Sequence, residues 1–200
     1  MERVGKDIPK SDEHAAQVLT TGRLVVLPTD TLYGFTTTLS DQTARRNILR
    51  LKGIGEKRFL YLASDADMVE CHIASWGCIS KAEMRTHWPA PLTCVFTAKR
   101  CPSWIGDTVA LRVPDDEWLR RVIARVGEPL LSTSVNLAGG PPLGNADDIE
   151  RRFGSDVQLM VVDHGGPRSE SSTLVDMTTP APRVIRPGAY AWPTGEKPSK

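Results

Sequence analysis

The sequence lacks the long apolar segment that a membrane protein needs. No run of 18 apolar residues occurs among its 200 positions, which argues against a transmembrane helix. The first 14 residues, MERVGKDIPKSDEH, contain no apolar stretch of the kind that forms a signal peptide. We therefore expect a cytoplasmic protein that does not bind membranes. The net charge of +1 gives no overall attraction to nucleic acid, so any basic surface must be local.

Several common motifs are also missing, and each absence excludes a type of site. The chain has no GxxxxGK[ST] phosphate loop, no GxGxxG after a strand, no GxSxG elbow and no strong histidine-based triad. Its four cysteines lack the CxxC spacing of most zinc sites, although His72 and His87 lie among them. We interpret them as structural thiols of a reducing compartment and expect no metal site. They are Cys71, Cys78, Cys94 and Cys101.

The stretch from Leu24 to Thr36, LVVLPTDTLYGFT, is the most informative part of the chain. Its four apolar residues are typical of a buried strand, and Pro28 predicts that the strand ends there or lies at a sheet edge. The Thr-Asp-Thr at 29–31 places two hydroxyls and a carboxylate directly after the strand, with Tyr33 and Gly34 closing the turn. Open α/β sheets build ligand sites in this way. An ordinary Asx-type turn would produce the same pattern without a ligand.

Later segments repeat this combination of an apolar strand with polar groups at its end. Residues 129–136, PLLSTSVN, end in hydroxyl and amide side chains that suit an oxygen-rich ligand. The predicted strand 108–114 carries Arg112, which favours a carboxylate or phosphate, although a structural salt bridge would satisfy it equally well. Residues 171–176, SSTLVD, place hydroxyls at a strand start. The segment KGIGEKR at 52–58 is either a phosphate-binding loop or a solvated loop.

These patterns predict a single-domain α/β fold in which helices flank a twisted mixed sheet. We expect the domain at residues 11–190, an N-terminal extension at 1–10 and a flexible C-terminal tail at 191–200. Ser11 is the expected N-cap of a first helix at 11–22. If the polar strand ends converge, they line one concave, positively charged cleft that suits a nucleoside triphosphate and a small polar acid. The other helices are expected at 43–53, within 68–87, at 117–126 and at 147–153, and the strands at 24–27, 59–63, 94–97, 108–114, 129–136, 157–163, 171–176 and 183–186.

Six motifs in a fixed order resemble those of the YrdC/Sua5 family. They are PTDTLYGF at 28–35, WPAPLT at 88–93, LRVP at 111–114, STSVN at 132–136, SSTLVD at 171–176 and IRPG at 185–188. Their shared order over about residues 11–190 argues against a chance match. The chain is similar to the short, single-domain form of the threonylcarbamoyl-AMP synthases. These nucleotidyltransferases join L-threonine and bicarbonate with ATP to give threonylcarbamoyl-adenylate and pyrophosphate.

The resemblance implies roles for ten residues. Those expected to bind L-threonine are Thr31, Arg112, Ser132 and Ser172, and those expected to bind ATP are Lys52, Arg58, Thr108, Ser134, Asn136 and Arg186. It further implies Mg²⁺ accompanying ATP, no tightly bound cofactor and no metal ligands from the protein. The product would serve the threonylcarbamoyl modification of adenosine 37 in tRNA, with tRNA or a transferase complex as a partner. No residue is assigned as a catalytic base.

The segment 52–58 departs from the KxR pattern of this family. Ile54 stands at the arginine position, and Lys57 or Arg58 would restore the charge. An unreplaced arginine removes a charge-assisted hydrogen bond of roughly 1.5–3 kcal/mol. Two alternatives to the enzyme therefore stay open. The chain could be a diverged, non-catalytic YrdC-like protein that binds RNA or nucleotide, or a carbamoyl-transfer relative with another acceptor.

Overall fold

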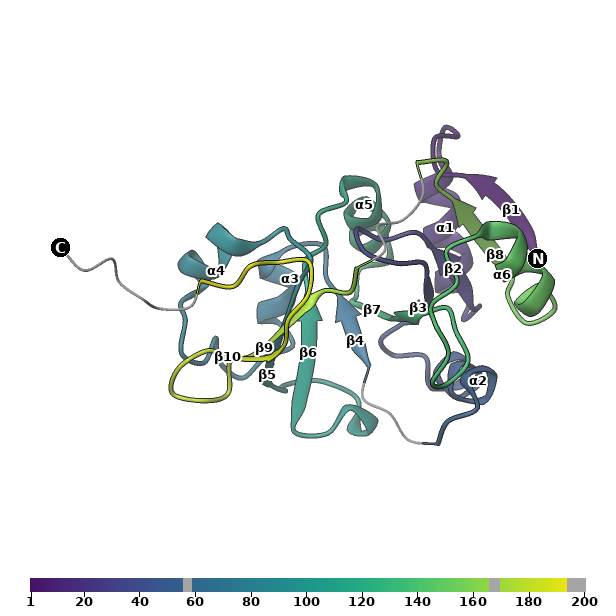
Figure 1. The fold of residues 1–200 in the computed structure, drawn as a ribbon. Coiled ribbons are helices and arrows are strands. Elements are labelled where there is room, and N and C mark those ends of the chain that lie inside the picture. Colours follow the sequence, from purple (N-terminus) through teal and green to yellow (C-terminus); the bar gives the residue numbers. More distant parts are fainter. Residues whose placement is uncertain (56–58, 166–169, 194–200) are drawn as a thin grey trace.

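The computed structural model describes residues 1–55, 59–165 and 170–193, and ten strands within them form one sheet (Figure 1). The strands lie in the order β1-β8-β2-β3-β7-β4-β6-β5-β9-β10. They are β1 (Glu2–Gly5), β2 (Val25–Leu27), β3 (Gly34–Thr38), β4 (Leu60–Leu62), β5 (Leu92–Thr97), β6 (Thr108–Arg112), β7 (Leu130–Ser134), β8 (Leu159–Val162), β9 (Thr173–Asp176) and β10 (Arg183–Arg186). The helices are α1 (Ser11–Thr20), α2 (Gln42–Lys52), α3 (Ala66–Glu70), α4 (Lys81–His87), α5 (Glu117–Val126) and α6 (Ala146–Phe153), with a 3₁₀ turn η1 at Ser103–Ile105.

The sheet is mixed, which confirms the expected fold class. β8 runs parallel to both β1 and β2, whereas β3 and β7 are antiparallel to their neighbours at the centre of the sheet. The pairs β4–β6 and β5–β9 are parallel, and the antiparallel pair β9–β10 forms the far edge. The strands at the centre come from distant parts of the chain, and the fold brings their polar side chains together.

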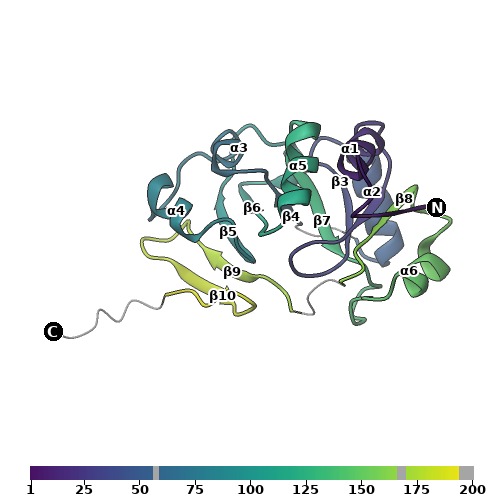
Figure 2. The same cartoon turned by 90° about the horizontal axis from the view of Figure 1, so that it is seen from above.

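Helices α1 and α5 lie side by side on the sheet, as both views show (Figures 1 and 2). Leu19 of α1 and Leu119 and Val122 of α5 are fully buried with Val25 and Leu159 of the strands beneath them. On α5 the apolar residues recur at helical spacing, so one face of the helix packs on the sheet and the other faces solvent. This small core fixes one end of the sheet.

A larger core surrounds α2 and α6. The rings of Phe35 on β3 and Phe153 on α6 meet edge to face with centroids 5.0 Å apart. Helix α2 begins at Asp41, whose side chain accepts a hydrogen bond from the backbone N–H of Ala44. It ends at Gly53, which has a positive φ of 66° and therefore favours glycine. These ends agree with the sequence prediction.

Three expectations were wrong, and one strand was not expected. Residues 2–5 are not an extension outside the domain but form β1, which pairs in parallel with β8. Residues 34–38, expected to follow a turn, form β3, which pairs with both β2 and β7. Ser11 is not an N-cap, because its hydroxyl donates to the carbonyl of Lys6 and accepts from Trp118 Nε1. Trp192, expected in a flexible tail, stacks on His87 with ring centroids 4.8 Å apart. Residues 194–200 of that tail lie outside the described part of the chain.

Among the residues that the structure describes, no helix is long and apolar enough to cross a membrane.

Candidate active site

A cavity of about 520 Å³ opens over the middle of the sheet. Its floor is a row of residues in register across five strands, in which Ser132 pairs with Leu60, Leu60 with Ala110, Ala110 with Val95, and Val95 with Asp176. Residues directly opposite one another in a sheet share a face, so the five side chains form one surface. The volume of the cavity falls within the usual range of small-molecule sites.

Most of the residues predicted to bind substrates line this cavity. Of the ten, Lys52 and Asn136 do not line it, and Arg58 lies outside the described residues. The structure therefore brings together side chains from β6, β7, β10 and the segments after β2 and before β9. The predicted residues that line the cavity are Thr31, Thr108, Arg112, Ser132, Ser134, Ser172 and Arg186. Their individual ligands remain predictions.

The turn after β2 is held by the hydroxyl of Thr29. This oxygen accepts hydrogen bonds from the backbone N–H groups of Thr31 and Leu32, both at 3.1 Å, and donates to the carbonyl of Leu32. It also lies 3.0 Å from Thr31 Oγ1. Either hydroxyl could be the donor in that contact. These contacts fix the orientation of Thr31 at the cavity wall.

Arg112, the last residue of β6, is almost completely buried and contacts this turn. Its Nη1 donates to Thr31 Oγ1 at 3.1 Å, and its Nη2 lies 3.3 Å from Asp30 Oδ1 in an ion pair. The other oxygen of Asp30 accepts from the backbone N–H of Asp115 at 3.0 Å. Within the described residues, Nε of Arg112 has no hydrogen-bond partner. Nε is thus a donor that the described residues leave unpaired, although it is closed off from solvent.

Burial lowers the pKa of Arg112 and the charge of Arg186 lowers it further, whereas the carboxylate of Asp30 raises it. Arginine starts so far above neutral pH that it stays charged in such surroundings. A charged, buried fork with an unused donor is suited to an anionic group with two oxygens, such as a carboxylate.

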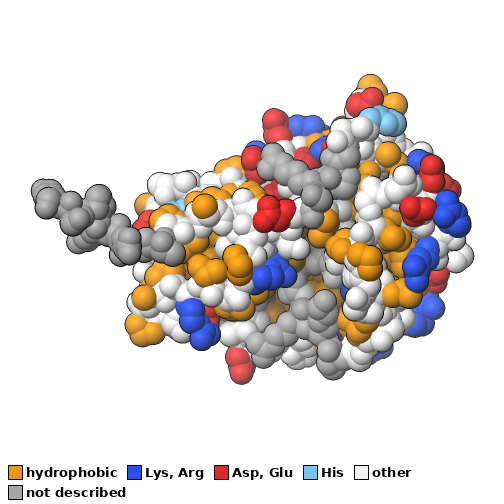
Figure 3. Space-filling model, in the orientation of Figure 1, with side chains coloured by type: hydrophobic (Ala, Val, Ile, Leu, Met, Phe, Trp, Pro, Cys, Tyr) orange, Lys and Arg blue, Asp and Glu red, His pale blue; other side chains and the backbone are white. Residues whose placement is uncertain are grey.

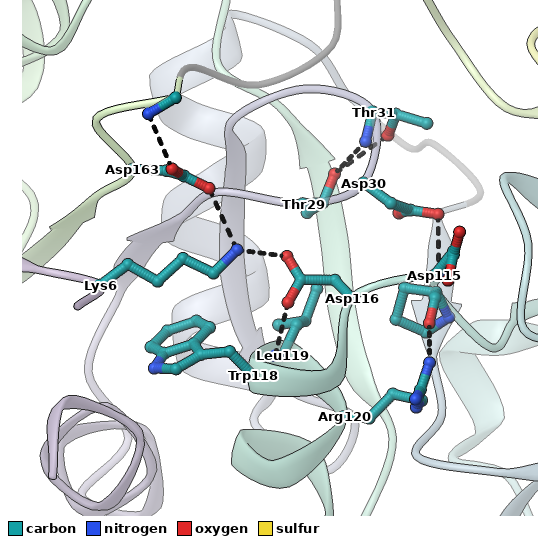
Figure 4. A network of polar contacts seen from close by, with 12 residues as sticks. Lys6, Thr29, Asp30, Thr31, Asp115, Asp116, Trp118, Leu119, Arg120 and Asp163 are labelled. Atoms are coloured by element: carbon teal, nitrogen blue, oxygen red, sulfur yellow. Dashed lines mark hydrogen bonds and ion pairs between the residues drawn. The ribbon is translucent and has the colours of Figure 1, made fainter. Parts of the chain in front are cut away.

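A second polar network lies behind the turn (Figure 4). Nζ of Lys6 donates to Asp116 at 2.7 Å and to Asp163 at 3.0 Å. Burial opposes the charge on Lys6, but these two carboxylates raise its pKa above the ordinary value. The backbone N–H of Asp163 donates to the hydroxyl of Tyr33, which lines the cavity. This network joins the segment after β1, the start of α5 and the end of β8 around the cavity wall.

The serines predicted to face the amino acid are closely packed. A Cβ atom at Gly34 would lie only 2.5 Å from Ser132 Oγ, so glycine is needed there for Ser132 to keep its position. Ser172 Oγ lies 2.8 Å from Thr93 Oγ1, and the carbonyl of Ser172 accepts from Nη2 of Arg186 at 2.9 Å. The last contact holds Arg186 against the same wall of the cavity.

Lys52 and Asn136 support the wall of the cavity. Nζ of Lys52 donates to the carbonyls of Ser134 and Asn136, at 2.7 and 3.2 Å, and to Asn136 Oδ1 at 2.5 Å. Asn136 in turn accepts from the hydroxyl of Ser134 and donates to the carbonyl of Gly140. Lys52 is 2% exposed, so it fixes the segment after β7 from behind.

Sequence reasoning missed several residues of the cavity. The sequence analysis did not single out Arg45 within its predicted helix. A charged residue on the apolar face of α2 is nevertheless a signal that the sequence contains. The structure also adds Thr29 and the rings of Tyr61 and Trp104 to the lining, and Asp176 at the end of β9. Burial raises the pKa of Tyr61 to about 12, so it is a neutral hydroxyl at physiological pH.

The lining carries more positive than negative charge. Of the described lining residues, three are arginines (45, 112 and 186) and one is an aspartate, Asp176. That carboxylate already accepts from the backbone and hydroxyl of Thr178 and from Arg183.

Among the described residues, no group of three or more His, Cys, Asp or Glu side chains could hold a metal ion. Cys94 is buried in the core, and all four cysteines are free thiols.

A protein-family model described as "Telomere recombination" and named for Sua5, YciO and YrdC matches residues 17–188. The chain belongs to the Sua5/YciO/YrdC family.

Relatives within the Sua5/YciO/YrdC family share both sequence and fold with this chain. A threonylcarbamoyl-AMP synthase of Thiobacillus denitrificans is 33% identical over 163 residues, which cover 79% of this chain and 86% of that protein. The P. abyssi Sua5 structure, solved as a complex with L-threonine, has a TM-score of 0.81 and 27% identity over 94% of this chain. This chain spans only 57% of that Sua5 chain. E. coli YciO, with a TM-score of 0.81 and 23% identity, covers 94% of both chains and shows the shared fold.

Proposed function

We propose that this chain is a threonylcarbamoyl-AMP synthase, which makes threonylcarbamoyl-adenylate and pyrophosphate from L-threonine, bicarbonate and ATP. The observation that supports this most strongly is one cavity in which a buried, charged Arg112 lies beside hydroxyl side chains and near Arg186. Relatives that match most of the chain carry this name, and one solved relative was crystallised with L-threonine.

The end of the cavity near Arg112 is suited to the amino acid. The guanidinium of Arg112 would pair with the carboxylate of L-threonine, and Thr31, held by Thr29, would lie beside it. Ser132 and Ser172 supply hydroxyls for the polar groups of the substrate. The ion pair with Asp30 keeps the guanidinium in place before the substrate arrives, which lowers the cost of ordering it on binding.

The nucleotide would lie next to the amino acid. Arg186, whose charge acts on Arg112, supplies a cation where the two substrates meet, and Thr108 and Ser134 supply hydroxyls. The threonine amine and bicarbonate give a carbamate with loss of water. An oxygen of this carbamate then attacks the α-phosphorus of ATP, and the bond to pyrophosphate breaks. Such a transfer depends mainly on positioning and on neutralising charge, so no protein nucleophile is needed.

Mg²⁺ would enter with ATP as part of the substrate. Asp176 is the one described carboxylate that lines the cavity, and its oxygens already accept three hydrogen bonds. The ion would therefore be held by phosphate oxygens and water, which matches the usual coordination of Mg²⁺ in phosphate-transfer sites. The adenylate product would pass to a transferase that modifies adenosine 37 of tRNA, and this pathway would operate in the cytoplasm.

The alternative of a non-catalytic RNA-binding protein rests on the altered segment 52–58. Basic side chains on the face shown in Figure 3 form separate groups interspersed with acidic and apolar ones, and the net charge is only +1. Strong binding to RNA phosphates needs many basic contacts. This distribution of charge argues against strong RNA binding and therefore favours the enzyme.

One assay separates the two functions. Purified protein would be mixed with L-threonine, ¹³C-bicarbonate, ATP and Mg²⁺, and the products analysed by mass spectrometry. The enzyme predicts a threonylcarbamoyl-adenylate that contains the label, with one pyrophosphate for each molecule of product. Absence of this product, together with salt-sensitive binding of tRNA, would favour the non-catalytic alternative.

A further inference from the structure

The segment that follows β10, residues 187–193, packs against the cavity wall, and the roles proposed above give it no function. It runs back to the end of α4 (Figure 1), where the hydroxyl of Tyr190 lies 2.7 Å from Nδ1 of His87. The ring of Trp192 stacks on that of His87, with centroids 4.8 Å apart. Two aromatic side chains therefore fasten this segment to α4.

The backbone of this segment pairs with the strand start that carries Ser172. The N–H of Ala189 donates to the carbonyl of Ser171 at 2.9 Å, on one side of Ser172. On the other side, the hydroxyl of Thr173 donates to the carbonyl of Tyr190 at 2.6 Å and accepts from its N–H at 3.1 Å. Residues 189 and 190 thus hold both neighbours of Ser172.

The two segments fit closely together. A Cβ atom at Gly188 would overlap the carbonyl oxygen of Ser171 and lie 2.6 Å from the carbonyl carbon of Ser172, so glycine is needed there. Ser172 is 3% exposed, and its hydroxyl lies 2.8 Å from that of Thr93 at the cavity wall. Because the side chain of serine is short, the position of its hydroxyl follows that of its backbone. A shift of residues 171–173 would therefore move a group that lines the cavity.

We propose that His87 and Tyr190 are positioning residues for Ser172. This inference rests on the proposed function, in which Ser172 binds the amino acid. The hydrogen bond between the two side chains fixes Tyr190, and the backbone of Tyr190 fixes Thr173, next to Ser172. Holding the hydroxyl in place before the substrate arrives lowers the cost of ordering it on binding, so the expected effect is on the affinity for L-threonine.

The first test removes the hydrogen bond from each side in turn. Tyr190→Phe loses the hydroxyl and keeps the ring, and His87→Phe loses the nitrogen and keeps a ring for Trp192 to stack on. Calorimetric titration would measure the dissociation constant of L-threonine, and thermal melting would confirm folding. Because both variants lack the same hydrogen bond, we expect both to weaken L-threonine binding to the same extent, about two- to tenfold.

A conservative pair of variants tests the next contact along the chain. Thr173→Val keeps the shape of the side chain but loses both hydrogen bonds to the backbone of Tyr190, so it should weaken L-threonine binding at least as much as Tyr190→Phe. Thr173→Ser keeps the hydroxyl and should resemble the wild type. Thr20→Val is the matched control, because it removes an exposed hydroxyl that donates within α1, and it should leave the affinity unchanged.

A double-mutant cycle with Ser172→Ala separates positioning from a general loss of stability. If Tyr190 acts through Ser172, Tyr190→Phe should have no further effect on the affinity for L-threonine once the hydroxyl of Ser172 is gone. A lower melting temperature with an unchanged affinity in the single variants would overturn the inference. Equal losses of affinity from Tyr190→Phe with and without the Ser172 hydroxyl would overturn it as well.

Formation of the adenylate distinguishes this inference from the proposed function. A wild type that binds L-threonine with this coupling to Ser172 but makes no threonylcarbamoyl-adenylate would refute the proposed function and support the positioning role. A wild type that makes the adenylate, with an affinity that Tyr190→Phe, His87→Phe and Thr173→Val leave unchanged, would refute the positioning role alone. A wild type that binds no L-threonine would refute both.

Discussion

Replacing Arg112 by lysine tests the amino-acid end of the cavity without removing its charge. Arg112→Ala would leave the carboxylate of Asp30 buried without its ion-pair partner, and breaking a buried pair in this way costs about 3–5 kcal/mol. That is a large part of the total stability of a domain, about 5–15 kcal/mol. Lysine keeps a cation near Asp30 but cannot reproduce the fork that contacts Thr31, Asp30 and a ligand together.

The expected effect of Arg112→Lys is a rise in the KM for L-threonine. Losing one charge-assisted hydrogen bond to the substrate carboxylate costs about 1.5–3 kcal/mol, which corresponds to about ten- to a hundredfold in affinity. The assay is pyrophosphate release as a function of threonine concentration at saturating ATP. Because the proposed function places ATP elsewhere in the cavity, the KM for ATP should change much less.

Arg121→Lys is the matched control, since Arg121 lies on the exposed side of α5 and pairs with Glu117. It should leave both KM values unchanged. If Arg112→Lys melts close to the wild type and still shows an unchanged KM for L-threonine, the assignment of the carboxylate to Arg112 is incorrect.

Three further predictions follow from other contacts. Gly34→Ala should push Ser132 out of place and raise the KM for L-threonine several-fold. Gly144→Ala is the control, because an added Cβ there meets nothing within 4 Å, and it should leave this KM unchanged. The same KM for L-threonine in both variants would remove Ser132 from the site. Lys6→Met should lower the melting temperature at neutral pH. Burial is the largest single effect and tends to raise the pKa of Asp163, but the hydrogen bond and charge of Lys6, together with the backbone N–H of Gly165 and the charge of His164, lower that pKa below 3.8. The stability that Lys6 contributes through Asp163 is therefore present above pH 3.8 and is lost as the pH falls through the folded-state value. The difference between wild type and variant should therefore shrink in acid, and a constant difference down to pH 2 would contradict the assignment. Arg58→Ala should raise the KM for ATP if Arg58 restores the charge missing at Ile54, and an unchanged KM would exclude it.

The sequence predicted the cavity better than it predicted the sheet. Hydroxyls and arginines next to apolar strands were visible as a pattern, and the fold places most of them in one cavity because their strands are neighbours. Lys52 and Asn136 lie behind it, since their hydrogen-bonding groups are used by each other and by the backbone. Such pairing depends on three-dimensional contacts that spacing along a sequence does not reveal.

The strands that were missed have weak local signals. β3, GFTTT, is buried along its whole length between β2 and β7, so it shows no alternation of apolar and polar residues. β1 has one large apolar residue, Val4, and is a strand because β8 offers it a partner at the sheet edge. Arg45 was missed although its spacing from Ile48 and Leu49 places it on the apolar face of α2, because a single charged residue on a helix normally faces solvent.

A structure of the protein with L-threonine and a non-hydrolysable ATP analogue tests the central claim most directly. We predict both ligands in the one cavity, with the threonine carboxylate within hydrogen-bond distance of Arg112 and the α-phosphate near Arg186. Threonine bound outside this cavity, or a triphosphate that does not contact Arg186, would contradict the account.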